Sequence, residues 1–197
     1  MNARLEPRGI SIVNPNNEKA PVARISYYLE HNEEIDLFVG AAQTDDLVKK
    51  GIQFSVPLYP LNGAFAKRKD DPFVFVNTDS LKGLTVGVLR GSRSVQTMNI
   101  EGVTVEETNT MEQSLKKLAA GRVDLVYYHD MGLAWQIKNF NLGSDVVLVD
   151  MPEKFDSSPH YIIFSKNVSQ KIITEINMAI ESMQADGSID RILQKYR

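Results

Sequence analysis

The sequence predicts an α/β protein whose sheets are largely parallel. β-prone runs alternate with segments that carry apolar residues at helical spacing along the whole chain. In addition, a pattern of tight turn, hydrophobic residue, Asp and strand occurs once in each half of the chain, at 34–37 and at 122–125. The repeat favours two similar lobes, and the alternative interpretation is that both copies are generic joints between a helix and a strand.

The composition is that of an ordinary globular protein. Of its 197 residues 43% are apolar and 24% charged, and the net charge is −3 with both signs interspersed. This balance predicts neither a nucleic-acid partner nor a membrane-surface patch. No apolar run approaches the ~20 residues that a spanning helix needs. The chain has no cysteine and its first residues do not form a signal peptide, so an exported protein would have lost its signal before this numbering starts.

Strands and helices of the first third follow from local signals. Pro21 is expected to open a helix, because a proline at the first helical position lacks only an N–H that would be unpaired anyway. The stretch 54–70 is β-prone and contains a proline, which favours an edge or crossover strand. The other expected elements are a strand at Ile10–Val13, an apolar helix face of Val22, Ile25 and Leu29, and a strand at Ile35–Val39 that ends in Gly40.

The remaining elements have clear start and stop signals. Thr110 and Gln113 have the spacing of a capping box, and Gly121 is expected to end the helix that they begin. Asp186 and Gly187 are expected to break a long helix near the end of the chain. The expected strands are Thr85–Leu89, Val123–Tyr128 and Tyr161–Lys166, and the expected buried helix faces are Met111, Leu115, Leu118 and Ala119, then Ile172, Ile173, Ile176, Ala179, Ile180 and Met183, then Ile189, Ile192, Leu193 and Tyr196.

Four segments together resemble a known family. They are Phe54–Tyr59 (FSVPLY), Leu81–Ser92 (LKGLTVGVLRGS), Leu118–Asp124 (LAAGRVD) and the pair Asp186–Ser188 with Lys195–Tyr196. In this order and at these spacings they resemble the bacterial extracellular solute-binding proteins of family 3, the amino-acid-binding group of ABC importers. Each segment alone is a weak signal, whereas four in register span nearly the whole chain.

The resemblance implies a periplasmic-binding-protein-like (type II) fold of two lobes. The first lobe is then discontinuous, at 1–62 and 163–197, and the second is 63–162, with hinge strands near 58–67 and 159–164. The first strand and helix of the family's first lobe have no counterpart here, which is expected of either a truncated product or a reduced variant. A sheet with such a gap exposes unpaired edges, so we expect a homodimer through the first lobe.

One departure from the family concerns the carboxylate clamp. Amino-acid binders place an arginine shortly after a first-lobe threonine, because a guanidinium donates two parallel hydrogen bonds to a carboxylate. Leu47 occupies that position here, and Lys49 is the cation that could replace it. The departure puts amino-acid specificity in question.

Candidate ligand contacts in the second lobe follow two predicted strands. Gly91, Ser92 and Arg93 lie where a strand meets a helix, a place suited to anions, and the alternative is that Ser92 or Ser94 caps the helix. Asp130 follows the strand that ends at His129, where the family has an aspartate that pairs with a ligand ammonium. The register leaves His129 as the alternative occupant, and a helix cap as the other role of Asp130.

Candidate contacts in the first lobe are weaker. Gln43 and Thr44 follow a strand and can hydrogen-bond a polar ligand, but a helix cap is the favoured role of Thr44. Arg24 lies in a Pro21–Arg24 turn found in some relatives, and its alternative role is a surface ion pair. Asp36 and Asp124 are expected to brace their helix–strand turns. Tyr127, Tyr128 and Trp135 are expected to pack in the core or at a rim, and the alternative is that they stack on a ligand.

No motif predicts an enzyme, a metal site or a cofactor. His31, His129 and His160 lack the spacing of a metal site, and the sequence has no nucleophile elbow and no P-loop. We therefore expect a periplasmic receptor that closes around a small polar solute in the cleft between its lobes and then meets a membrane permease. The alternatives are a ligand-sensing or orphan domain, or an enzyme like cyclohexadienyl dehydratase that uses Asp130.

Overall fold

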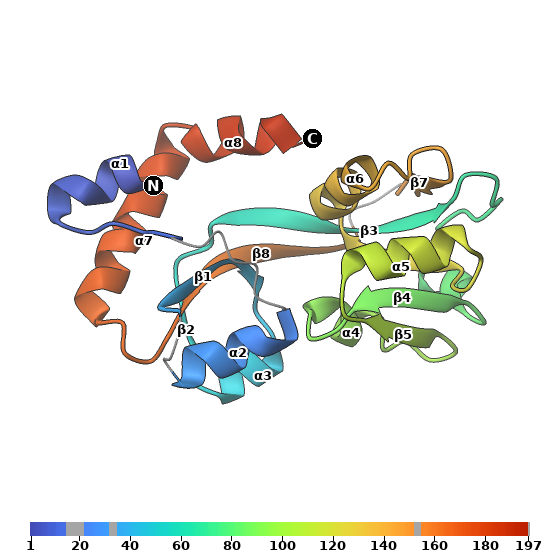
Figure 1. Cartoon of the computed structure of the whole chain (residues 1–197), viewed down its shortest axis with the longest axis horizontal. Coiled ribbons are helices and arrows are strands. Elements are labelled where there is room, and N and C mark those ends of the chain that lie inside the picture. The colour runs from blue at the N-terminus through green and yellow to red at the C-terminus, as the bar shows by residue number, and fades with distance from the viewer. Residues whose placement is uncertain (15–21, 32–34, 152–154, 197) are drawn as a thin grey trace. The chain divides into compact units, whose positions relative to one another are not determined.

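The computed structural model describes residues 1–14, 22–31, 35–151 and 155–196 of the chain (Figure 1). The chain forms two compact units. Unit 1 consists of Met1–Pro60 and Pro159–Arg197, and unit 2 consists of Leu61–Ser158. Two long strands, β3 (Tyr59–Arg68) and β8 (Phe155–Phe164), are sheet neighbours, and each continues from one unit into the other.

In unit 1, two short strands pair with the second half of β8. Both β1 and β2 run antiparallel to it, with Leu37 and Gln53 each opposite Phe164. The buried core of this unit joins helix α2 to β1 and β8 through Ile25, Leu29, Ala41, Ile52 and Ile163. The elements are α1 (Asn2–Leu5), η1 (Glu6–Arg8), α2 (Val22–His31), β1 (Leu37–Ala42), α3 (Asp45–Lys49), β2 (Gln53–Phe54), α7 (Gln170–Ala185), α8 (Ser188–Leu193) and η3 (Gln194–Tyr196).

In unit 2, the strands lie in the order β3-β6-β4-β5, and β7 also pairs with β3. The pairs β4–β5 and β4–β6 are parallel, whereas β3 runs antiparallel to β6 and β7. Helix α5 lies across β4, β5 and β6 (Figure 1). The elements are η2 (Thr78–Leu81), β4 (Thr85–Leu89), α4 (Arg93–Thr97), β5 (Thr104–Thr108), α5 (Met111–Ala119), β6 (Leu125–His129), α6 (Asp130–Asn139) and β7 (Val146–Leu148).

The core of unit 2 is rich in aromatic rings. The ring of Phe65 lies 5.4 Å from that of Phe75, 5.0 Å from that of Tyr127 and 5.8 Å from that of Phe155, measured between centroids. Such offset and tilted pairs stabilise a core beyond the area that they bury. The cluster joins β3, β6 and β8, and it therefore supports the polar groups that lie beside it.

Several predicted elements are confirmed and others are wrong. The strand at Thr85–Leu89 is confirmed, and β3 is the crossover strand that Pro57 indicated. Thr110 caps α5 by accepting a hydrogen bond from the Gln113 amide at 3.2 Å. The expectation of largely parallel sheets is wrong, because the strands that connect the units run antiparallel to their neighbours.

The predicted strand at Ile10–Val13 is wrong. The backbone N–H and carbonyl of Ile12 both hydrogen-bond to the side chain of Asn2, at 3.0 and 2.7 Å, so they are not offered to a neighbouring strand. The strand after α2 also does not end at Gly40. It continues to Ala42 through a register shift between Val39 and Ala41, where Gly40 takes a left-handed φ of 91°.

The expectations for two helix faces and for Asp124 also need correction. Ile172 and Ile192 are 37% and 46% exposed, so they lie at the edges of the buried faces of α7 and α8. Asp124 does not brace its own turn, because its side chain accepts a hydrogen bond from the Thr85 amide of β4 at 2.8 Å. Asp36 is exposed. Pro21 and the side chains of Val22 and Tyr196 lie outside the described residues.

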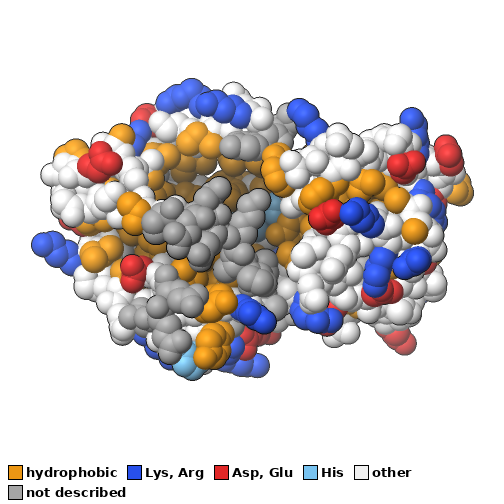
Figure 2. Space-filling view, viewed as in Figure 1, with side chains coloured by type: hydrophobic (Ala, Val, Ile, Leu, Met, Phe, Trp, Pro, Cys, Tyr) orange, Lys and Arg blue, Asp and Glu red, His pale blue; other side chains and the backbone are white. Residues whose placement is uncertain are grey.

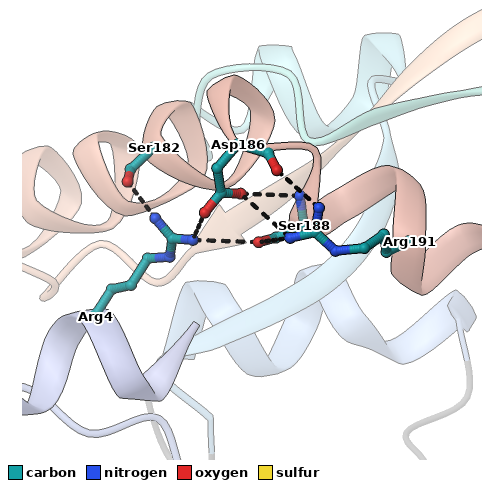
Figure 3. A network of polar contacts seen from close by, with 5 residues as sticks. All are labelled: Arg4, Ser182, Asp186, Ser188 and Arg191. Carbon is teal, nitrogen blue, oxygen red and sulfur yellow. Dashed lines mark hydrogen bonds and ion pairs between the residues drawn. The ribbon is translucent and has the colours of Figure 1, made fainter.

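The N-terminal helix is fastened to the C-terminal helices of unit 1. Leu5 is fully buried, and α1 contacts α7. Arg4 lies over the end of α7, where it pairs with Asp186 and donates to Ser182 and, at 3.2 Å, to Ser188 (Figure 3). Hydrogen bonds from Ser188 and then Arg4 hold the pKa of Asp186 below its usual range.

Gly63 of β3 is required by its surroundings. A Cβ atom there would lie 2.1 Å from the Tyr127 hydroxyl and 2.7 Å from the Phe155 carbonyl oxygen. Neither neighbour can yield easily, because one is the tip of a buried ring and the other is backbone. Any side chain at position 63 must therefore displace β6 or β8.

We predict that Gly63→Ala destabilises the protein by about 1–3 kcal/mol, the usual cost of overpacking a core. Urea unfolding followed by circular dichroism would measure the change. Gly143→Ala is the matched control, because a Cβ at Gly143 meets no atom within 4 Å. Equal stability of the two variants would contradict the contacts described for Gly63.

We predict that Leu5→Ala lowers the free energy of unfolding by about 2–5 kcal/mol, since it removes a fully buried side chain. Arg4→Ala should cost much less, because its ion pair with Asp186 is half-exposed. Val13, which is 73% exposed, provides the control substitution Val13→Ala. A Leu5→Ala variant as stable as the Val13→Ala variant would show that α1 is not packed on α7 in solution.

Candidate functional site

The candidate residues of unit 2 lie at one edge of its sheet. Gly91, Ser92 and Arg93 follow β4, and His129 and Asp130 stand at the end of β6 and the start of α6. Because β4 and β6 are parallel neighbours, their carboxyl ends meet at the same edge. In α/β proteins this edge is where ligands bind.

The turn after β4 is shaped by its own backbone. Gly91 has a φ of 74°, the left-handed region that glycine adopts without strain. Ser92 stands at the cap position of α4, but its hydroxyl donates back to the Leu89 carbonyl at 2.7 Å and does not cap the helix. Ser94 is buried. The predicted alternative of a serine cap on this helix is therefore wrong.

Arg93 is paired within the chain. Its guanidinium donates to Oδ1 of Asp156, a residue of β8. The other carboxylate oxygen of Asp156, Oδ2, accepts hydrogen bonds from the Thr97 hydroxyl and the Tyr127 hydroxyl, both at 2.9 Å. Side-chain exposure is 34% for Arg93 and 16% for Asp156. One carboxylate therefore receives three side-chain donors from α4 and β6.

The electrostatics of this cluster favour the ionised carboxylate. Burial by itself would raise the pKa of Asp156, but the hydrogen bonds from Arg93, Thr97 and Tyr127 outweigh it and hold that pKa below its usual range. Burial, followed by the nearby negative charge of Asp156, raises the pKa of Tyr127 far above its usual range. Tyr127 is therefore a neutral donor at physiological pH.

At the end of β6, His129 caps the next helix. Its Nδ1 atom accepts a hydrogen bond from the Gly132 amide at 2.9 Å, so in the neutral ring the proton is on Nε2. A Cβ atom at Gly132 would lie 2.2 Å from Cε1 of this ring, so the cap requires glycine. The cap that was the alternative role of Asp130 belongs to His129 instead.

Asp130 is the first residue of α6. Its Oδ1 accepts from the Met131 amide at 2.8 Å, and its Oδ2 accepts from the amide of Asn62 on β3 at 3.3 Å. Among the described residues it forms no ion pair. Its negative charge is thus held by neutral groups at the same sheet edge as the Arg93 cluster.

In unit 1, the structure places the predicted residues on separate elements. Thr44 caps α3 by accepting from the Leu47 amide at 3.3 Å, which confirms the favoured role. Gln43 is exposed in the preceding turn, and Arg24 is exposed on α2. Leu47, which the sequence analysis placed at the expected arginine position, is half-buried and packs against the apolar core that includes Ile25 and Leu29 of α2.

Three residues of these clusters escaped the sequence analysis. Asp156 and Thr97 lie far apart in sequence and meet only through the pairing of strands, and Asn62 reaches Asp130 from an antiparallel strand. The sequence signal that could have identified Asp156 is an aspartate next to Phe155 at the start of a β-prone segment. Aspartates in such positions are common in loops, so the signal does not single out a site.

The described part of the chain contains neither a candidate metal site nor a candidate membrane-spanning helix. Residues 1–14, 22–31, 35–151 and 155–196 hold no group of three or more His, Asp or Glu side chains placed to bind a metal ion. In the same ranges no helix is both long and apolar enough to cross a membrane. Acidic and basic side chains are interspersed on the face drawn in Figure 2.

Relatives share both sequence and fold with this chain. The L-cystine-binding protein TcyJ of Escherichia coli K12 is 26% identical over 168 residues, which are 84% of this chain and 61% of the relative. The lysine/arginine/ornithine-binding periplasmic protein of the same strain is 25% identical over 171 residues, 83% of this chain and 65% of the relative. The chain thus spans less than two thirds of the length of these curated relatives.

Solved structures agree. An ancestral arginine-binding protein is 26% identical and superimposes with a TM-score of 0.80 bound to arginine and 0.81 bound to glutamine; in both comparisons 99% of this chain and 84% of the other are covered. An ancestral amino-acid-binding protein described as a precursor of cyclohexadienyl dehydratase shares the fold, with a TM-score of 0.78 at 19% identity over 99% of this chain and 82% of that one.

The type II two-lobe fold expected from the resemblance is therefore confirmed. The family model described as bacterial extracellular solute-binding proteins, family 3, matches residues 24–197. This match covers most of the chain, including both candidate clusters of unit 2 and all the predicted contacts of unit 1. The chain belongs to the bacterial extracellular solute-binding proteins of family 3.

Proposed function

We propose that the protein binds a small, polar, amino-acid-like solute as the substrate-binding component of an ABC importer, without catalysing a reaction. The observation that carries this proposal is the likeness, at 26% identity, to an ancestral protein solved with arginine and with glutamine. The names of the curated relatives, which are all binding proteins, support it.

The two units are proposed as the two lobes. The proposed ligand contacts of unit 2 are those at the carboxyl edge of its sheet, where Asp130 supplies a negative charge suited to an ammonium group. The remaining contacts offer hydrogen bonds or a positive charge. Together the proposed contacts are Arg24, Gln43, Thr44, Gly91, Ser92, Arg93, His129 and Asp130.

Location and partners follow from the same proposal. The family is extracellular by its description, and one curated relative is named a periplasmic protein, so we propose a periplasmic location and a membrane permease as partner. A homodimer through unit 1 is a further part of the proposal, supported by the position of β1 at one end of the strand order, because an edge strand can pair with another chain.

We predict that a thermal-shift screen of amino acids, polyamines and carboxylates identifies a stabilising ligand with an ammonium group. A ligand that binds only the folded state raises the unfolding midpoint by mass action. No shift by any compound would contradict the importer role and favour a sensing or orphan domain. Turnover of prephenate that disappears in Asp130→Asn would instead establish the dehydratase-like alternative.

We predict that Asp130→Asn weakens binding of that ligand by roughly 10–100-fold, the value of one charge-assisted hydrogen bond. Isothermal titration calorimetry would measure the two affinities. Asp70→Asn is the matched control, since Asp70 is exposed and follows the C-terminal end of β3. The part of β3 near the proposed site is its N-terminal half, where Gly63 lies opposite His129. Equal affinities for Asp130→Asn and Asp70→Asn would show that Asp130 does not contact the ligand.

A further inference from the structure

The donors around Asp156 form a set of their own. Arg93 and Thr97 come from successive turns of α4, and Tyr127 comes from β6. All three donate to the carboxylate of a residue on another element, and together they serve both of its oxygens. A planar guanidinium with two hydroxyl donors is a combination suited to recognising a carboxylate.

One of the three donors, Tyr127, is held in place by packing that does not involve the Asp156 carboxylate. The Tyr127 ring packs in the aromatic cluster against Phe65 and Phe155, and Gly63 leaves room for its hydroxyl. Backbone strain lies at Asp156, the residue that supplies the carboxylate. Asp156 has a φ of 52°, in the left-handed region that is unfavourable for residues with a side chain.

We propose that Arg93, Thr97 and Tyr127 form a carboxylate-binding site that the chain's own Asp156 occupies. Once Asp156 is removed, the site binds an external monocarboxylate such as acetate. The lowered pKa of Asp156 agrees with a donor set that binds the anion more tightly than water does.

One consequence rests on the proposed function. While Asp156 fills the donor set, the charge of the Arg93 guanidinium is already neutralised and attracts the carboxylate of a solute less. Asp156 is then a specificity-determining residue that excludes acidic groups from this part of unit 2. The role of Arg93 toward the solute becomes indirect, through the position of α4.

The test uses Asp156→Gly. Glycine removes the carboxylate, leaves space for acetate and adopts a φ of 52° without strain. We expect acetate at about five times its Kd to raise the unfolding midpoint of this variant by about 2–4 °C relative to sodium chloride of equal ionic strength. Wild-type protein should show no such rise, because its site is filled.

Matched controls separate this site from general effects of anions. Asp156→Gly combined with Arg93→Gln should lose the response, and acetamide, which has the shape of acetate without its charge, should give none. Asp71→Gly is a second control, because Asp71 is also half-buried and paired with an arginine, Arg68, but its other donor among the described residues is the backbone amide of Phe73. An equal acetate response in the double variant or in Asp71→Gly would overturn the proposal.

The outcome is decisive even if the variant folds poorly. In that case the refolding yield of Asp156→Gly in acetate is compared with its yield in chloride, and equal yields overturn the proposal. Failure of the amino-acid screen would contradict the importer role and leave an acetate response intact. Conversely, absence of the acetate response would remove the carboxylate site and leave solute binding untouched.

Discussion

The carboxylate of Asp156 organises much of unit 2. A half-buried negative charge is costly unless it is paired and hydrogen-bonded, and three side-chain donors satisfy it here. Through this one group, α4 and β6 are tied to β8, the strand that returns the chain to unit 1. The positions of Arg93 and of the turn before it, where solute contacts are proposed, therefore depend on a residue more than sixty positions away in sequence.

An aromatic cluster packs next to this network and fixes the position of the Tyr127 ring. Phe65, Phe75, Tyr127 and Phe155 pack together, and the hydroxyl of Tyr127 reaches out of the cluster to the carboxylate. The absence of a side chain at Gly63 is what makes this reach possible. Tyr127 thus belongs both to the aromatic cluster and to the hydrogen-bond network, so a substitution that moves its ring also changes its hydrogen bond to Asp156.

The two charged groups at the carboxyl edge of the sheet differ in how they are balanced. The charge of Arg93 is neutralised by Asp156, whereas the donors that Asp130 receives from the described residues, the amides of Met131 and Asn62, are neutral. In unit 1, Leu47 is half-buried and packs against the apolar core. The proposed role of Asp130 toward a solute ammonium group rests on this difference in charge balance.

Local signals in the sequence were sufficient for the family, for most helices and strands and for the caps at Thr44 and Thr110, because these depend on neighbouring residues. Only the tertiary structure decided the antiparallel pairing of β3 and β8 with their neighbours, the cap at His129 and the partner of Arg93. The physical reason is that the Arg93–Asp156 ion pair depends on strand order, and the hydrogen bond from Tyr127 to Asp156 depends also on the space that Gly63 leaves for the Tyr127 hydroxyl. No periodicity or local spacing records such a contact.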